Sequence, residues 1–142
     1  MNKIRIVAIG CGRVAQHYKK ILDSGVVSNW RMVGFYDVLN DRAEYFAQHF
    51  NTESYESFES MLETAKPDLV LILTPSGLHY QHTKTAFDYD CHVLCEKPIT
   101  MLPVQAEELE QIASTKNLMY GTAFQNRLNP AIIALRKALK ES

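Results

Sequence analysis

Lys3-Ile4-Arg5-Ile6-Val7-Ala8-Ile9-Gly10-Cys11-Gly12-Arg13-Val14-Ala15 is the stretch that decides the fold of this chain. A short β-branched run ends in Gly-x-Gly-x-x-Ala, and a helical pattern begins at once. This order is typical of a dinucleotide-binding unit, although glycine turns also occur in ordinary β–α connections. Gly10 permits the tight turn, Gly12 lets backbone N–H groups approach a pyrophosphate, and Ala15 keeps the helix near the sheet. The stretch therefore predicts an anion at a helix N-terminus.

Length, charge and cysteine content exclude several classes of protein. The 142 residues are enough for one domain with a core, and 15 basic against 16 acidic residues leave a net charge of −1. No basic face points to nucleic acid, and no apolar stretch reaches the ~20 residues that cross a membrane. The start runs directly into a strand pattern, so we expect no signal peptide. Three cysteines without framework spacing favour a reducing, cytoplasmic setting.

Strand and helix patterns alternate along the chain. Strands are expected over residues 4–9, 30–37, 68–73, 91–95 and 118–124, with a brief extended piece near 54–55. Helical patterns fill the segments between them and follow Asn129-Pro130. The alternation predicts an α/β fold, a Rossmann-type doubly wound parallel sheet of about six strands in the order 3-2-1-4-5-6 with helices on both faces. Ligands of such sheets lie at the carboxyl ends of the strands.

Asp37 ends the second predicted strand, 27 positions after Gly10. A carboxylate there can accept hydrogen bonds from both hydroxyls of an adenosine ribose, and it repels a 2′-phosphate, so it favours NAD over NADP. A helix-capping aspartate is the plain alternative. Arg42 lies close enough in sequence to meet a phosphate, which keeps NADP open as the cofactor.

Glu96-Lys97-Pro98 closes the strand predicted over residues 91–95. A lysine held at a strand end can orient a nicotinamide or donate a hydrogen bond to a substrate hydroxyl. A surface junction between strand and loop is the alternative. The lysine also separates two functions, because an oxidoreductase uses a cation beside the nicotinamide, whereas a nucleotide-sensing module without turnover does not need one.

Four motifs together resemble the Gfo/Idh/MocA oxidoreductases, the family of glucose–fructose oxidoreductase and inositol dehydrogenase. They are Gly10-Cys11-Gly12-Arg13-Val14-Ala15, Thr74-Pro75-Ser76-x-x-His79, Cys95-Glu96-Lys97-Pro98 and Gln125-Asn126-Arg127. The resemblance runs from Lys3 to the last predicted helix, and Glu-Lys-Pro in its place after the fifth strand is the most specific element. It implies an NAD(P)-dependent dehydrogenase that acts on a sugar, cyclitol or nucleotide-sugar hydroxyl.

The resemblance also implies a role for each matching residue. The pyrophosphate would lie along Gly10, Cys11, Gly12, Arg13 and Val14, and the adenosine ribose on Asp37. Thr74, Pro75, Ser76 and His79 would border the dinucleotide, and Gln125, Asn126 and Arg127 would lie beside its nicotinamide end. Glu96 would meet the nicotinamide ribose. Lys97, the expected catalytic residue, would meet the nicotinamide and the substrate oxygen, with a cis bond to Pro98.

Members of the family continue into a second α/β domain, which supplies most of the substrate pocket and usually the acid–base histidine. Residues 1–142 match only the NAD(P)-binding domain, so we expect the cofactor half of an enzyme, inactive alone. Its partners would be the dinucleotide and, in the longer parent, a sugar-like substrate. The surface that the second domain would cover, at the helix after Asn129, predicts self-association and a homo-oligomer.

Cysteines and histidines around residues 91–95 raise the alternative of a metal site. Cys91 and Cys95 stand four apart on one face of a strand, with His82 and His92 nearby. A metal site favours tighter Cys-x-x-Cys pairs and a second ligand pair, so we expect buried cysteines and no metal. Cys11 is expected to fill space within the glycine turn, with a redox-sensitive thiol as the alternative.

Overall fold

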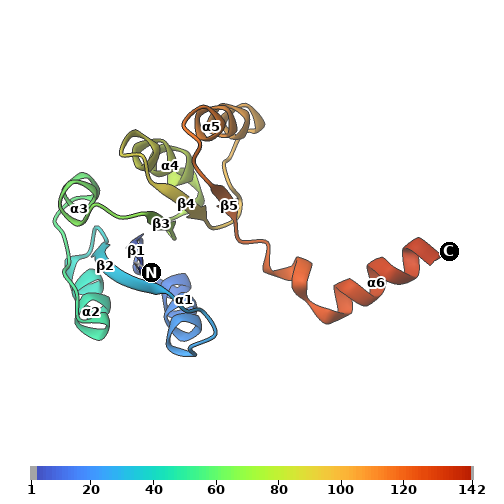
Figure 1. Cartoon of the computed structure of the whole chain (residues 1–142), viewed down its shortest axis with the longest axis horizontal. Helices are drawn as coiled ribbons and strands as arrows, with labels where there is room; N and C mark the ends of the chain where they lie inside the picture. The colour runs from blue at the N-terminus through green and yellow to red at the C-terminus, as the bar shows by residue number, and fades with distance from the viewer. Residues whose placement is uncertain (1–2, 142) are drawn as a thin grey trace.

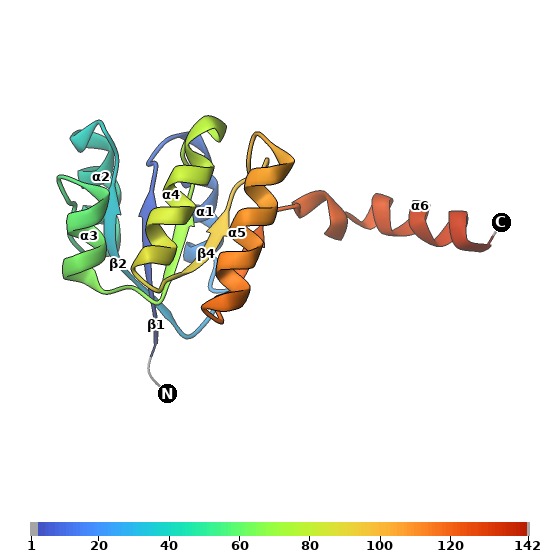
Figure 2. The same cartoon turned by 90° about the horizontal axis from the view of Figure 1, so that it is seen from above.

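The computed structural model describes residues 3–141, in which helices flank both faces of a parallel sheet (Figures 1 and 2). The strands are β1 (Ile4–Ile9), β2 (Trp30–Tyr36), β3 (Leu69–Ile72), β4 (His92–Cys95) and β5 (Tyr120–Thr122). The helices are α1 (Arg13–Asp23), α2 (Asn40–Phe50), α3 (Phe58–Ala65), α4 (His79–Asp88), α5 (Pro103–Thr115) and α6 (Pro130–Glu141). Two short 3₁₀ turns are η1 (Ser76–Leu78) and η2 (Gln125–Leu128). The predicted α/β, doubly wound class is confirmed.

The strands lie in the order β2-β1-β3-β4-β5, and each neighbouring pair is parallel. In β1, Val7 and Ile9 join a core with α3, α4 and α5, whereas Ile6 and Ala8 join a core with α1 and α2. Because β1 and β3 are covered on both faces, their sequences are nearly continuous apolar runs.

The brief extended piece expected near residues 54–55 forms a single bridge. Ser54 pairs in parallel with Phe35 of β2, where the Phe35 N–H donates to Glu53 O at 3.1 Å and the Tyr55 N–H donates to Phe35 O at 3.0 Å. Ser57 then caps α3 with its side chain, so the chain turns into a helix before a strand can extend. The predicted order of six strands is therefore corrected to five, with this bridge standing where strand 3 was expected.

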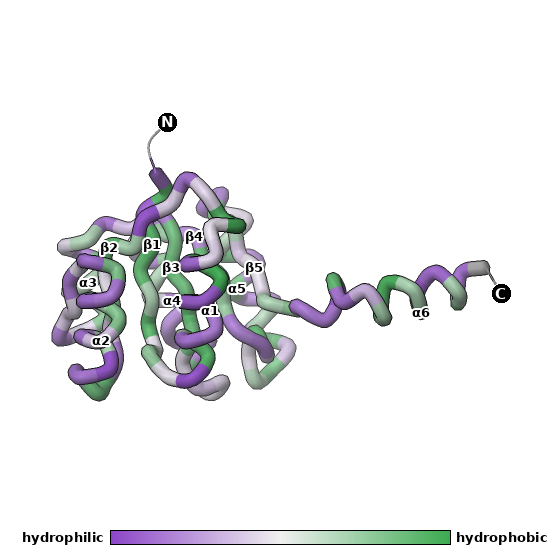
Figure 3. Tube along the Cα trace, turned by 90° about the horizontal axis from the view of Figure 1, so that it is seen from below, coloured by the Kyte–Doolittle hydropathy of each residue, from purple (hydrophilic) through white to green (hydrophobic). Residues whose placement is uncertain are grey.

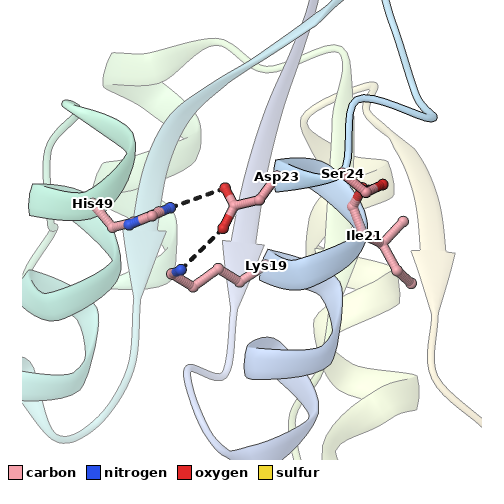
Figure 4. A network of polar contacts seen from close by, with 5 residues as sticks. All are labelled: Lys19, Ile21, Asp23, Ser24 and His49. Atoms are coloured by element: carbon pink, nitrogen blue, oxygen red, sulfur yellow. Dashed lines mark hydrogen bonds and ion pairs between the residues drawn. The ribbon is translucent and has the colours of Figure 1, made fainter.

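Polar contacts join α1 to α2 on the surface (Figure 4). The Asp23 carboxylate accepts from the Lys19 ammonium at 3.0 Å and lies 2.9 Å from His49 Nε2. Hydrogen bonds from His49 and then from Lys19 lower the pKa of Asp23. The group is exposed, so solvent screens it and its contribution to stability is small. It lies at the C-terminal ends of the two helices, opposite the carboxyl ends of the strands.

Helix α6 stands apart from the sheet (Figures 1 and 2). Asn129 caps it by accepting from the Ala131 N–H at 2.9 Å, and Pro130 is its first residue, which confirms the predicted helix start. Apolar and polar residues alternate along it (Figure 3), and every residue from 124 to 140 is exposed. In the part of the chain that the structure describes, no helix combines the length and apolar character needed to cross a membrane.

Candidate functional site

The glycine turn joins β1 to α1 at the carboxyl end of the strand. Gly10 has a φ of +90°, and a Cβ there would lie 2.8 Å from Leu73 C and Thr74 N, so only glycine fits. Gly12 is the N-cap of α1, and a Cβ there would meet nothing within 4 Å. No side chain caps α1 and no acidic residue lies in its first turn. The N-terminus of α1 is therefore open to an anion.

Asp37 follows β2 and is bonded to the glycine turn. Its Oδ2 accepts from the Cys11 N–H at 2.7 Å, and its Oδ1 accepts from the Leu39 N–H at 2.9 Å. The N-cap of α2 is Leu39, without a side-chain cap, so the alternative that Asp37 serves as a helix cap is wrong. Carboxylate oxygens have more than one lone pair each, so Asp37 can still accept from a hydroxyl.

A hollow of about 420 Å³ opens between α1 and α2 beside the turn. Its lining is Cys11, Gly12, Arg13, Gln16, Asp41, Arg42, Tyr45 and Phe46. Arg13 and Arg42 bring positive charge to this hollow, which suits phosphate groups. A 2′-phosphate near the turn would meet both the attraction of Arg42 and the repulsion of Asp37, so these two residues act in opposite directions on the choice between NAD and NADP.

The predicted site residues after β3 differ in burial. Thr74 and Ser76 are half-buried, and Pro75 is exposed. His79, at the start of α4, is only 1% exposed. Its Nε2 lies 2.8 Å from Thr74 O, and its Nδ1 lies 2.6 Å from Pro98 O. Both ring nitrogens of this predicted site residue are thus committed to backbone carbonyls of the protein itself.

Glu96, Lys97 and Pro98 follow β4 at the same edge of the sheet. The half-buried Glu96 accepts from the Tyr18 hydroxyl of α1 at 3.0 Å through Oε1, and from the Lys97 N–H at 3.2 Å through Oε2. The Lys97-Pro98 bond is cis, which confirms that prediction. The Lys97 side chain is exposed, and no acceptor among residues 3–141 holds its ammonium.

A second hollow, of about 620 Å³, lies on the other flank of α1. It is lined by His17, Tyr18, Ile21, Glu96, Thr122, Ala123, Phe124, Gln125, Arg127, Leu128 and Arg136. The structure brings together three predicted site residues here, Glu96, Gln125 and Arg127. The exposed Asn126 and Lys97 lie outside this lining.

Sequence reasoning missed Tyr18 and Arg136. Helical spacing assigns Tyr18 to the apolar stripe of α1, yet its hydroxyl reaches Glu96, and burial followed by the charge of Glu96 raises its pKa. The polar tip of Tyr18 was the available signal, because a buried tyrosine hydroxyl usually has a partner. Nothing in the sequence of α6 marks Arg136 as a site residue. It reaches the hollow only because of the path that the chain takes through η2.

The three cysteines are free and buried. Burial raises the pKa of the Cys11 and Cys95 thiols to about 12 and that of Cys91 to about 11. The thiols are therefore protonated at neutral pH, which suits space filling and not nucleophilic chemistry. Among residues 3–141, no three His, Cys, Asp or Glu side chains gather closely enough to hold a metal ion.

Comparison with known proteins finds oxidoreductases. The family model GFO_IDH_MocA, "Oxidoreductase family, NAD-binding Rossmann fold", matches residues 4–124. D-glucoside 3-dehydrogenase of Escherichia coli (strain K12) is 32% identical over 129 residues, which cover 89% of this chain and 36% of that protein. UDP-N-acetylglucosamine 3-dehydrogenase of Acidithiobacillus ferrooxidans is 30% identical over 142 residues, which cover 97% of this chain and 42% of that protein.

A solved structure extends the similarity to the whole described fold. The WlbA dehydrogenase from Chromobacterium violaceum, in complex with NADH and UDP-GlcNAcA, matches with a TM-score of 0.92 and 25% identity. The match covers 99% of this chain and 41% of that one. This chain thus spans about two fifths of the length of the relatives that it matches.

Proposed function

We propose that this chain, which belongs to the Gfo/Idh/MocA oxidoreductase family, is the cofactor-binding part of an NAD(P)-dependent dehydrogenase. The enzyme would transfer a hydride between nicotinamide and a hydroxyl-bearing carbon of a sugar, cyclitol or nucleotide sugar. The names of its relatives support this substrate class, since they include dehydrogenases of D-glucoside, glucose 6-phosphate and UDP-N-acetylglucosamine.

One observation carries the proposal: three groups suited to a dinucleotide lie at the carboxyl ends of parallel strands. The open N-terminus of α1 follows β1, the Asp37 carboxylate follows β2, and Glu96 with Lys97 follows β4. Carboxyl ends of parallel strands meet at one edge of the sheet, where ligands of such folds bind. An ordinary β–α turn needs neither the carboxylate after β2 nor the exposed lysine after β4.

The dinucleotide would extend along this edge. Its pyrophosphate would accept from backbone N–H groups of the turn, which Gly12 leaves accessible, and its adenosine ribose would donate to Asp37. Val14 would lie beside the pyrophosphate, and Thr74, Pro75 and Ser76 would border the middle of the molecule. We propose NAD(H) as the preferred cofactor because the carboxylate of Asp37 repels a 2′-phosphate.

When bound, the nicotinamide supplies the hydride acceptor for the reaction. Glu96, oriented by Tyr18, would accept from the nicotinamide ribose. The ammonium of Lys97, exposed and without an acceptor among residues 3–141, would donate a hydrogen bond to the reacting oxygen and hold it in place. Arg127 would lie at the nicotinamide end of the hollow that it shares with Glu96.

The rest of the active site would come from a second domain. The relatives are more than twice as long as this chain, so we propose that residues outside 1–142 supply the substrate pocket and the group that moves the hydroxyl proton. We further propose that the longer protein is a cytoplasmic homo-oligomer. The exposed apolar side chains of α6 support an interface there, and the free, protonated cysteines support a reducing compartment.

Two measurements test the proposal. Fluorescence titration of residues 1–142 with NADH should show saturable binding, while sugar oxidation by the same chain should be undetectable. In the full-length protein, Lys97→Met should lower kcat by about 10²–10⁴-fold and change NADH affinity much less. Lys20→Met, an exposed lysine in the last turn of α1, is the matched control and should leave kcat unchanged.

The outcomes separate the enzyme from a binding module. A wild-type chain that fails to bind NADH would refute the dinucleotide site. Full-length protein that binds NADH but turns over no sugar, with no effect of Lys97→Met, would instead support a sensing module. Undiminished turnover in Lys97→Met would remove the lysine from the mechanism.

A further inference from the structure

His79 connects two neighbouring strand ends through a single ring. Thr74 lies just after β3 and Pro98 just after β4, and the two carbonyl oxygens stand 2.8 Å from Nε2 and 2.6 Å from Nδ1 of the imidazole. The ring is 1% exposed, so water does not compete for either contact. An imidazole in this position fixes the distance between the two backbone segments.

The chemistry of the partners fixes the role of the ring. A carbonyl oxygen only accepts, so each contact is a hydrogen bond only if the ring nitrogen carries a proton. Both contacts together therefore require N–H groups on both nitrogens. The neighbouring His82 has a different environment, because burial and then the charge of His79 lower its pKa. His82 meets a hydroxyl, Thr74 Oγ1, at 3.0 Å, and a hydroxyl can both donate and accept.

One of the two connected segments is closely packed. The Leu73–Thr74 peptide lies directly against Gly10, since a Cβ on Gly10 would come within 2.8 Å of Leu73 C and Thr74 N. His82 additionally holds the Thr74 side chain. The other segment, Lys97-Pro98, is exposed at the edge of the sheet. The ring of His79 therefore connects the exposed segment to the closely packed one.

We propose that His79 is a positioning residue for Lys97, which acts by donating hydrogen bonds to both Thr74 O and Pro98 O. It thereby sets where the Lys97 side chain begins relative to the glycine turn, although its own ring does not touch the dinucleotide. The inference rests on the proposed function, because it assigns His79 to the nicotinamide end of that site.

A comparison of two ligands tests this role in the 142-residue chain. NADH spans the whole site, whereas ADP-ribose lacks the nicotinamide. His79→Phe keeps a flat ring but has no N–H, so Lys97 would no longer be held in place to donate to the nicotinamide. NADH affinity should then fall about fivefold, the effect of losing that one hydrogen bond to the ligand, while ADP-ribose affinity should stay within about twofold. His82→Phe removes the contact with Thr74 but leaves Pro98 O untouched, and should leave both affinities within about twofold.

A conservative variant distinguishes the positioning role from a folding defect, and a spectrum of the wild-type chain tests the protons on the His79 ring. His79→Gln keeps an amide donor and should recover part of the NADH affinity that His79→Phe loses. In the wild-type chain, ¹⁵N spectra of the His79 ring should show protons on both nitrogens. Equal losses of NADH and ADP-ribose affinity, or no loss of either, would overturn the positioning role, and a ring with one protonated nitrogen would overturn the double donation. If wild-type protein binds neither ligand, the proposed function fails instead.

Discussion

Asp37 Oδ2 accepts a hydrogen bond from the Cys11 N–H at 2.7 Å, which ties the end of β2 to the glycine turn after β1. The same carboxylate accepts from the Leu39 N–H at 2.9 Å, so it also orders the approach to α2. The acid is thus held in place by the protein before a ligand arrives. A ribose binding there would find its acceptor already oriented, which lowers the entropic cost of binding.

Removal of this carboxylate should change cofactor choice. Asp37→Ala should weaken NADH binding by about tenfold or more, because hydrogen bonds to charged groups are worth about 1.5–3 kcal/mol. The affinity for NADPH should fall less, because the repulsion of the 2′-phosphate is lost and Arg42 still lines the hollow beside the glycine turn. Parallel fluorescence titrations with NADH and NADPH measure the ratio of the two affinities in the wild type and in the variant. Asp88→Ala, which removes an exposed carboxylate at the end of α4, should preserve the ratio of the two affinities, and tighter NADPH than NADH binding by the wild type would reverse the assignment.

The two glycines of the turn should respond differently to alanine. Gly10→Ala places a Cβ 2.8 Å from backbone atoms at a φ of +90°, so it should lower the free energy of unfolding by at least ~2 kcal/mol. In Gly12→Ala the added Cβ meets no protein atom within 4 Å, so the free energy of unfolding should stay within ~0.5 kcal/mol of the wild-type value. The variant should nevertheless lose about tenfold or more in NADH affinity, because its Cβ stands where the pyrophosphate approaches.

Urea unfolding and NADH titration of both variants give the comparison. Gly77→Ala is the control, because a Cβ there also meets nothing within 4 Å, and it should alter neither stability nor binding. Unchanged NADH affinity in Gly12→Ala would argue against a pyrophosphate at the turn.

The buried thiols should make the fold sensitive to alkali. Their pKa values rise from an ordinary value of 9.0 to about 12 for Cys11 and Cys95 and to about 11 for Cys91. Above pH 9 the unfolded chain releases thiol protons that the folded chain retains, so unfolding becomes more favourable as pH rises. The contribution of the thiols to the free energy of unfolding should therefore be constant with pH below about 9 and fall between about pH 9 and 12. Urea titrations across that range should show the fall.

One substitution isolates the contribution of a single thiol. Cys91→Ala removes a group whose Sγ donates to Pro67 O and Tyr89 O at 3.4 Å, and it should reduce the slope of stability against pH between about 9 and 11. The slope isolates the ionisation of the Cys91 thiol, because the smaller side chain of alanine lowers the free energy of unfolding by the same amount at every pH. A slope identical to that of the wild type would show that Cys91 ionises equally in both states.

Helix α6 should drive self-association. Ile133 and Leu135 are 51% and 55% exposed, and Phe124 and Leu128, which precede the helix, are 54% and 80% exposed. Light scattering should therefore detect dimers or larger species as protein concentration rises. The double variant Ile133→Lys, Leu135→Lys should shift the chain to monomer, whereas Met119→Lys, at a still more exposed apolar position before β5, should not. A wild-type chain that stays monomeric at high concentration would contradict this expectation.

Local patterns were enough to predict most of the fold. The β-branched run before Gly10 and the continuous apolar run over residues 69–72 identify buried parallel strands, because alternation disappears when both faces are covered. The extended piece at Ser54 could not be sized in this way. The length of this piece depends on where α3 begins. Because Ser57 caps α3 three residues later, only one bridge, between Ser54 and Phe35, forms.

The sequence by itself determined the glycine turn, the acid after β2 and the Glu-Lys-Pro element, because each depends on neighbours only a few residues away. Tertiary structure alone decided that Tyr18 bonds to Glu96, 78 positions along the chain, and that His79 joins Thr74 to Pro98. Periodicity reports which residues are buried, and does not report which carbonyl or carboxylate a buried polar group will meet. That choice is made by the packing of α1 and α4 against the strands, where a buried donor has to find its acceptor across the sheet.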